Sequence, residues 1–162
     1  MDKVKVSDKL LLSVEKPARY TGGELNSIVK ETARLRFALC FPDVYEIGMS
    51  HLGSRILYEV INSREEYACE RCFAPWPDME KAMRENNVPM FTLETRTPLA
   101  ECDIVGFSLL YEMCYTNILT MLDLAHIHKR SADRGENEPI IVAGGGCACN
   151  PEPIADFMDA IM

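Results

Sequence analysis

The segment Asp103-Ile104-Val105-Gly106-Phe107-Ser108-Leu109 is apolar almost throughout once its first residue is passed. A run without polar alternation predicts a strand that is buried on both faces, which is typical of a parallel sheet covered by helices. Leu35–Phe41 has the same character, and Pro42-Asp43 ends it. We therefore expect these two strands to lie next to each other in the interior of one parallel sheet.

Outward from these two strands, helical and extended patterns alternate along the chain. Helices are predicted over 52–62, 78–87 and 115–126, with a helix start over 151–158, and further extended segments over 68–74, 90–93, 140–143 and 159–162. This alternation predicts an α/β fold, a doubly wound parallel sheet of about five strands in flavodoxin-like order.

Residues 1–34 differ from the rest and are predicted to form an N-terminal arm packed on an α/β domain of residues 35–162. Ser7-Asp8 can cap a short helix over 9–15 that Pro17 ends, and residues 24–31 could form another helical turn or two. The arm shows no chemistry of its own. Because the chain ends on a bare apolar strand, we expect a domain truncated at its C-terminal end, the N-terminal piece of a longer protein.

Composition and charge exclude several classes of function. With 48% apolar residues the chain can fill a core, so wholesale disorder is excluded. The net charge of −8, with basic residues only in scattered pairs, argues against direct binding to nucleic acid. The longest uncharged stretch, 139–151, falls short of the roughly 20 residues of a membrane span, and no secretory signal is present. We expect a cytoplasmic protein and no membrane contact.

The seven cysteines are interpreted mostly as small buried hydrophobic residues. Cys69 and Cys72 fall in a predicted strand, where positions three apart point to opposite faces and cannot share one metal ion. Cys147 and Cys149 share a face of a predicted loop and could bind a soft metal, but no second pair lies nearby in the sequence. We predict neither zinc nor a disulfide. No motif of nucleophile and base stands out, so no catalytic residue is predicted.

Three loops, 42–53, 108–114 and 144–150, follow three neighbouring strands and should meet at the carboxyl edge of the sheet, where this architecture binds ligands. The predicted cleft is lined by Tyr45, His51, Ser108, Tyr111 and Gly144–Gly146. His51 could be a metal ligand, an acid or base, or a helix cap, and capping or packing is the commoner case. The small residues let a bulky flat partner approach the backbone. Gly145→Leu is therefore expected to leave the isolated domain folded.

Several separated segments agree in order with a known family. They are Phe41–Gly53, Ile61–Glu65, Glu70–Trp76, Asp103–Leu109 and Ala143–Pro153. Over about residues 17–162 the chain resembles the N-terminal domain of a family of radical S-adenosylmethionine (SAM) proteins, which carry a cobalamin-binding-like domain ahead of the radical barrel. The resemblance implies a downstream radical barrel as the partner within the same protein. S-adenosylmethionine and the [4Fe–4S] cluster are expected there, because no three cysteines here follow the Cys-x3-Cys-x2-Cys spacing.

The resemblance also implies cobalamin as a candidate cofactor. Cobalamin-binding domains carry Asp-x-His-x-x-Gly, then Ser-x-Leu, then Gly-Gly after successive strands. His51, Ser108-x-Leu110 and Gly144-Gly145 match, whereas Met49 stands at the position of the Asp that normally polarises the cobalt-ligating His. The expected function is an accessory domain of a radical SAM enzyme that binds cobalamin or packs on the barrel. The alternative is a structural or interaction domain that kept the fold and lost the ligand.

Overall fold

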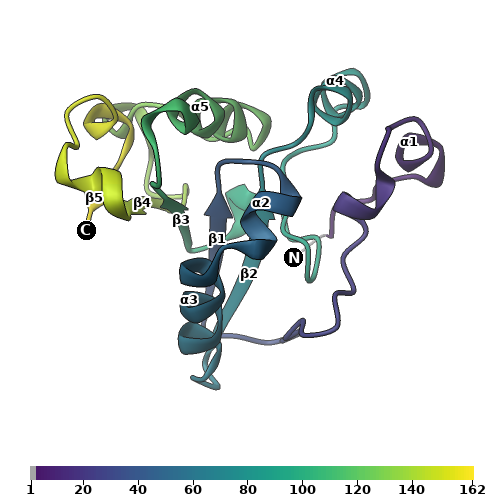
Figure 1. The fold of residues 1–162 in the computed structure, drawn as a ribbon, viewed down its shortest axis with the longest axis horizontal. Coiled ribbons are helices and arrows are strands. Elements are labelled where there is room, and N and C mark those ends of the chain that lie inside the picture. The colour runs from purple at the N-terminus through teal and green to yellow at the C-terminus, as the bar shows by residue number, and fades with distance from the viewer. Residues whose placement is uncertain (1–2) are drawn as a thin grey trace.

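The computed structural model describes residues 3–162, and its centre is a five-stranded parallel sheet in the order β2-β1-β3-β4-β5 (Figure 1). The strands are β1 (Leu35–Phe41), β2 (Tyr67–Phe73), β3 (Ile104–Ser108), β4 (Ile140–Gly144) and β5 (Ala160–Ile161). This is the flavodoxin-like strand order. The two apolar strands β1 and β3 pair with each other inside the sheet, with Cys40 opposite Phe107, as predicted.

Helices cover both faces of the sheet. On one face, α3 (Leu52–Asn62) packs on β1 and β2, with Tyr58 against Leu39 and Cys69. On the other face, α4 (Pro77–Asn86) and α5 (Tyr115–Leu124) bury their apolar sides in the main core. In Figure 1, α3 lies in front of β1 and β2. The structure therefore has the doubly wound architecture that the alternating pattern predicts.

The main core lies between the sheet and the pair α4 and α5. Because successive strand residues point to opposite faces, Ala38 and Cys40 of β1 belong to this core while Leu39 points toward α3. The largest wholly buried side chains include Met79, Met83, Ile118, Met121 and Leu122 from the two helices. Among the described residues no helix is both long and apolar enough to cross a membrane.

The arm contains less helix than its sequence predicts, and its first two residues lie outside the described part of the chain. Ser7 caps α1 (Asp8–Leu11) as expected, with the N–H of Leu10 3.2 Å from its Oγ, but this helix is shorter than the predicted 9–15. A 3-10 turn, η1 (Pro17–Tyr20), follows it.

Of the one or two helical turns that could form over 24–31, the structure has a single turn, in which the N–H of Ser27 donates to the carbonyl of Glu24 at 3.0 Å. The rest of the segment is irregular and bonds to the domain. The N–H of Ile28 donates to the Tyr58 hydroxyl at 2.7 Å. The Lys30 ammonium donates to the carbonyls of Asn62, Arg64 and Tyr67 at 2.6–2.8 Å. These contacts hold the arm along the edge of the sheet at β2.

Two further differences lie near the strand ends. The loop predicted after β1 contains a six-residue helix, α2 (Tyr45–Ser50). Gly48 packs against the ring of Phe73 and interrupts the apolar pattern by which a helix is recognised in the sequence. The predicted helix start over 151–158 contains a turn over 152–154 and the 3-10 turn η6 (Ala155–Phe157) instead of an α-helix. Other 3-10 turns are η2 (Leu99–Glu101), η3 (Glu112–Cys114), η4 (Ser131–Asp133) and η5 (Gly146–Cys149).

Candidate functional site

The loops that follow β1 and β3 are tied together at the carboxyl edge of the sheet. The Tyr111 hydroxyl donates to the carboxylate of Asp43. The side-chain amide of Asn117 donates to the carbonyl of Pro42 at 3.0 Å. These contacts join residues far apart in the sequence, as the strand order requires.

The loops after β3 and β4 are tied in the same way through Leu109. Its N–H donates to the Gly144 carbonyl at 2.7 Å, and its carbonyl accepts from the N–H of Cys147 at 3.1 Å. Ser108 and Gly144 are direct partners in neighbouring strands. The structure therefore brings Ser108, Leu110, Tyr111 and Gly144–Gly146 to one edge, with Ser108 buried and Leu110 and Tyr111 exposed.

Gly145 is required by internal packing. Its φ of 127° and ψ of −170° lie in a region that only glycine enters readily. A Cβ at this position would lie 2.5 Å from the carbonyl oxygen of Leu109, whereas a Cβ at Gly146 would meet no described atom within 4 Å. This geometry argues against the expectation that Gly145→Leu leaves the domain folded, because the close neighbour of Gly145 is its own chain.

His51 caps α3. Its Nδ1 accepts from the N–H of Ser54 at 3.1 Å and lies 2.9 Å from the Ser54 hydroxyl, and its ring centroid is 5.2 Å from that of Phe41. A neutral imidazole that accepts at Nδ1 carries its proton on Nε2. Cobalt ligation through Nε2 needs the opposite tautomer, with the proton on Nδ1. The cap therefore does not fit a cobalt-ligating role for His51.

Tyr45 points away from the loops after β3 and β4. Its hydroxyl donates to Glu24 of the arm at 3.3 Å, and its ring packs edge-on against Phe73 at a centroid distance of 5.5 Å. Burial raises its pKa, and the nearby Glu24 carboxylate adds to that effect. Tyr45 thus connects α2 to the arm.

The cysteines are distributed over both faces of the sheet. Cys69 packs against the α3 side and Cys72 against the α4 side, as the strand alternation predicts. Burial raises the pKa of Cys69 and of Cys102 to about 12, so both remain thiols at neutral pH. Cys147 is half-buried and Cys149 is exposed. In the described residues no group of three or more His, Cys, Asp and Glu side chains is arranged to hold a metal ion.

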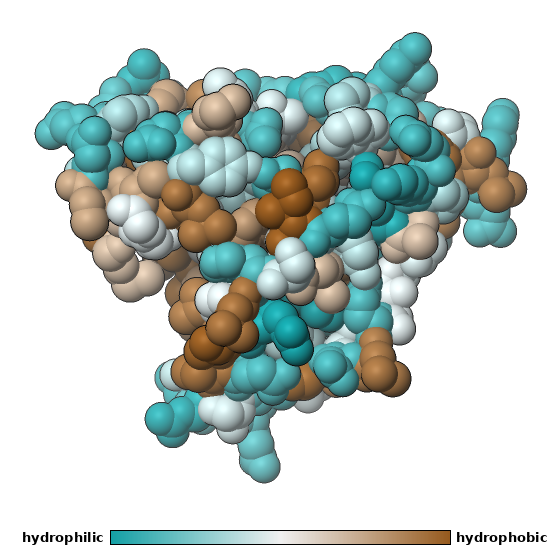
Figure 2. All heavy atoms as spheres, in the orientation of Figure 1, coloured by the Kyte–Doolittle hydropathy of each residue, from teal (hydrophilic) through white to brown (hydrophobic). Residues whose placement is uncertain are grey.

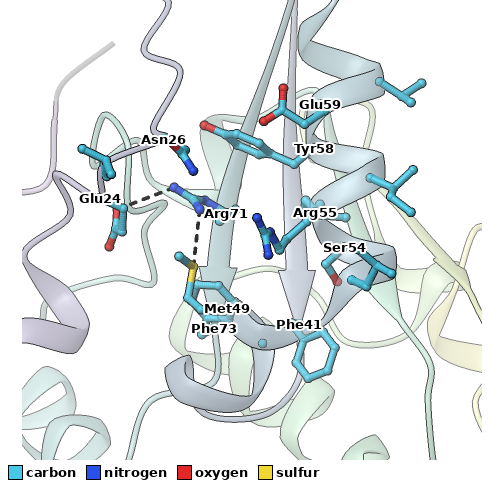
Figure 3. Close-up of a pocket in the computed structure, with 16 residues that line it drawn as sticks. Glu24, Asn26, Phe41, Met49, Ser54, Arg55, Tyr58, Glu59, Arg71 and Phe73 are labelled. Carbon is cyan, nitrogen blue, oxygen red and sulfur yellow. Dashed lines mark hydrogen bonds and ion pairs between the residues drawn. The ribbon is translucent and has the colours of Figure 1, made fainter.

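A pocket of about 560 Å³ opens between the arm, α3 and the face of β1 and β2 (Figure 3). The residues predicted to form the site all lie in the described part of the chain, and none of them lines this pocket. Its lining consists of Glu24, Leu25, Asn26, Leu39, Phe41, Gly48, Met49, Leu52, Ser54, Arg55, Ile56, Tyr58, Glu59, Val60, Arg71 and Phe73. Figure 2 shows apolar side chains gathered over α3, where the lining residues Leu52, Ile56 and Val60 are more than half exposed.

Arg71 forms the polar floor of this pocket. Its Nε donates to Glu94 at 2.6 Å, its backbone N–H donates to the same carboxylate at 2.7 Å, and its guanidinium lies 4.5 Å from the centroid of the Tyr58 ring. Burial raises the pKa of Glu94, and the charge of Arg71 opposes that shift. Burial alone lowers the pKa of Arg71, but Glu94, together with Tyr58 and Glu24, more than compensates, and the pKa is raised. The pair therefore keeps a charged guanidinium inside the fold.

A second buried ion pair lies on the other face of the sheet. Arg36 donates to Glu70, whose carboxylate also accepts from the hydroxyls of Thr92 and Thr95 at 2.5 and 2.6 Å. The Glu70 side chain is 1% exposed. These contacts satisfy the carboxylate from within the fold, and we assign this cluster a structural role.

The comparison with protein families gives one match. The model of a family described as the N-terminal part of radical SAM proteins matches residues 53–162, about two thirds of the chain. The matched range contains α3 to α5, β2 to β5 and the loops after β3 and β4, whereas the arm, β1 and α2 precede it. No curated protein matches the chain.

Proposed function

Since the chain belongs to the family of N-terminal domains of radical SAM proteins, we propose that it is an accessory domain that docks on a radical SAM catalytic domain through the carboxyl edge of its sheet. The docking surface consists of Ile47, Leu110, Tyr111 and Met113, which we call the edge surface. These side chains come from α2 and from the loop after β3.

The exposure of the edge surface carries this proposal. Met113 is 85% exposed, Ile47 47% and Leu110 39%, although all three are large apolar side chains. Large apolar side chains exposed on neighbouring loops of one sheet edge favour an interaction site there. The bonds from Tyr111 to Asp43 and from Leu109 to Gly144 fix the surrounding loops. A fixed apolar surface loses little conformational entropy on docking, which favours a stable contact.

The test is a binding measurement between this chain and the catalytic domain of the radical SAM protein to which it belongs, produced as separate polypeptides. Met113→Asp should weaken binding about tenfold or more, because a charge replaces an apolar contact. Leu12→Asp is the matched control, since Leu12 is an equally exposed apolar residue, at 81%, on the arm. Equal binding by Met113→Asp and the unmodified chain, with both folded, contradicts the proposal.

Cobalamin binding at the same edge is the second candidate. The open space at Gly146 and the small pair Ser108 and Gly144 favour it, whereas the cap formed by His51 does not fit cobalt ligation. Any cobalamin held here would therefore lack a cobalt bond from this histidine. The test mixes the protein with hydroxocobalamin, removes free cofactor by desalting and records the visible spectrum. A His51→Ala variant should retain as much cofactor as the unmodified protein, and loss of the cofactor contradicts this arrangement.

A further inference from the structure

The helix α3 distributes its polar and apolar side chains in the reverse of the usual order. A surface helix of a globular domain normally buries an apolar side and exposes a polar one. The residues that α3 buries all carry polar groups, and they are Ser54, Tyr58 and Asn62, with Ile61 half-buried beside them. The side that faces away from the sheet is apolar. We call it the outer face of α3, and it consists of Leu52, Ile56, Leu57 and Val60.

The polar inner side of α3 is bonded within the fold. The side-chain amide of Asn62 donates to the carbonyl of Cys69 and accepts from the N–H of the same residue, both at 3.0 Å. The Tyr58 hydroxyl accepts from the N–H of Ile28 at 2.7 Å. These bonds fix the rotation of the helix about its axis, so the outer face cannot turn toward the sheet. It therefore stays in contact with solvent unless another molecule covers it.

The outer face has the shape of a helix-packing surface. Leu52, Ile56 and Val60 are four residues apart, so they form one row along the helix, about 12 Å long at 1.5 Å a residue (Figure 2). The same row is one wall of the pocket, and Leu25 of the arm is wholly exposed on another. A ridge of side chains spaced four residues apart, with a hollow beside it, is the surface against which a second helix packs.

Two opposite charges on one flank of this face select the partner. Arg55 and Glu59 are both exposed, lie one turn apart and line the pocket side of the helix (Figure 3). Among residues 3–162 no ion pair engages either of them, whereas α4 forms two pairs at the same spacing. In a second copy that runs antiparallel, Glu59 lies beside Arg55 of the first and Arg55 beside Glu59. The flank is thus complementary to itself and locally neutral, although the whole chain carries −8.

We propose that the outer face of α3 binds a second copy of this chain. The two α3 helices pack antiparallel around a two-fold axis near Ile56, with Leu52 of each copy against Val60 of the other and Arg55 of each paired with Glu59 of the other. Such a two-fold contact, with the same surface used by both copies, is the commonest form of association between identical chains. The outer face and the edge surface share no residue, so this contact goes beyond the proposed docking on a catalytic domain.

The test is sedimentation velocity on the 162-residue chain over a series of concentrations at low salt. The unmodified chain should shift from monomer to dimer as its concentration rises. Ile56→Asp should weaken dimerisation about tenfold or more, because two carboxylates would meet at the axis. Leu12→Asp is the matched control, since Leu12 is an exposed apolar residue of the arm outside this face. Circular dichroism confirms that each variant is folded.

Charge reversal identifies the partner and its direction. Arg55→Glu and Glu59→Arg should each weaken dimerisation about tenfold, because both ion pairs become contacts between like charges. The variant that combines the two reversals should dimerise like the unmodified chain, because the flank is again complementary to itself. A double variant that dimerises no better than the single ones overturns the proposal.

Three other results would also overturn it. They are a chain that stays monomeric up to its limit of solubility, a dimer that Ile56→Asp leaves intact, and a dimer that Met113→Asp dissociates. The last result would place the self-contact on the edge surface instead. Binding of the separate catalytic domain, measured with Ile56→Asp, keeps the two proposals apart. That binding should be unchanged, and its loss together with a monomeric unmodified chain would place the catalytic domain on the outer face of α3.

Discussion

Gly145→Ala should destabilise the protein strongly, although the neighbouring Gly146→Ala should not. The backbone of Gly145, at φ 127° and ψ −170°, costs a residue with a side chain about 1–3 kcal/mol. The new Cβ would also lie 2.5 Å from the carbonyl oxygen of Leu109, so one backbone has to move. Movement of Leu109 strains its bonds to Gly144 and Cys147, worth about 1 kcal/mol each.

Together these effects amount to about 3 kcal/mol. In a domain of this size each kcal/mol lowers the melting temperature by about 2–4 °C, so we expect a decrease of about 6–12 °C. Thermal unfolding followed by circular dichroism, with urea unfolding at 25 °C as a second measure, checks this value.

Gly146→Ala is the matched control. A Cβ there meets nothing within 4 Å among the described residues, and its φ is not positive. We expect a change within about 0.5 kcal/mol. The reasoning is refuted if the two alanine variants melt at the same temperature, because the backbone of Gly145 would then be free to relax.

Three further predictions concern other parts of the molecule. The pKa of Glu46 is lowered to about 2, chiefly by the hydrogen bond that it accepts from Arg19 of the arm. Its stabilisation of the docked arm is therefore complete above pH 4.5 and is lost as the pH falls toward 2. The fluorescence of Trp76, the single tryptophan, should report that transition in the unmodified protein and not in Glu46→Gln. Glu70→Ala leaves a buried guanidinium unpaired and should cost about 3–5 kcal/mol in urea unfolding, and a loss below about 1 kcal/mol contradicts the buried pair. Only Cys149 and, more slowly, Cys147 should react with a thiol reagent in the folded protein, and fast reaction of any buried thiol contradicts the assigned burial.

The sheet could be predicted from sequence because its strands are marked by local composition. β1 and α3 begin and end where the apolar patterns place them, at Leu35–Phe41 and Leu52–Asn62. The sequence pattern does not predict α2, because Gly48, which packs against Phe73, interrupts the apolar pattern of the helix. The segment over 24–31 could form a helical turn or two, but apart from the bond of Ser27 to Glu24 its backbone and Lys30 bond to distant parts of the domain. Contacts between residues far apart in the chain cannot be predicted from a local sequence pattern.

The candidate site could likewise be predicted only in part from the sequence. The edge loops follow from strand order, since parallel strands end at the same edge, and the structure brings Ser108, Tyr111 and Gly144 together there. The pocket could not be predicted, because its walls come from the arm, α3 and two strands, and no motif joins them. The adjacent charges of Glu70 and Arg71 within a buried strand were the one signal. A charged residue in a buried strand needs a partner, and the partner of Arg71, Glu94, lies 23 positions further along the chain.

The arm sets the order in which this protein can fold as it is synthesised. The N–H of Val4 bonds to the carbonyl of Arg96, and that of Glu15 bonds to the carboxylate of Asp78. These arm residues are made before their partners, so they have no place to dock until the chain is made beyond residue 96. The arm should therefore dock late in folding, because contacts so distant in sequence form slowly. Until the arm docks, Arg71 at the floor of the pocket lacks the wall formed by Glu24 and Ser27 and stays open to solvent.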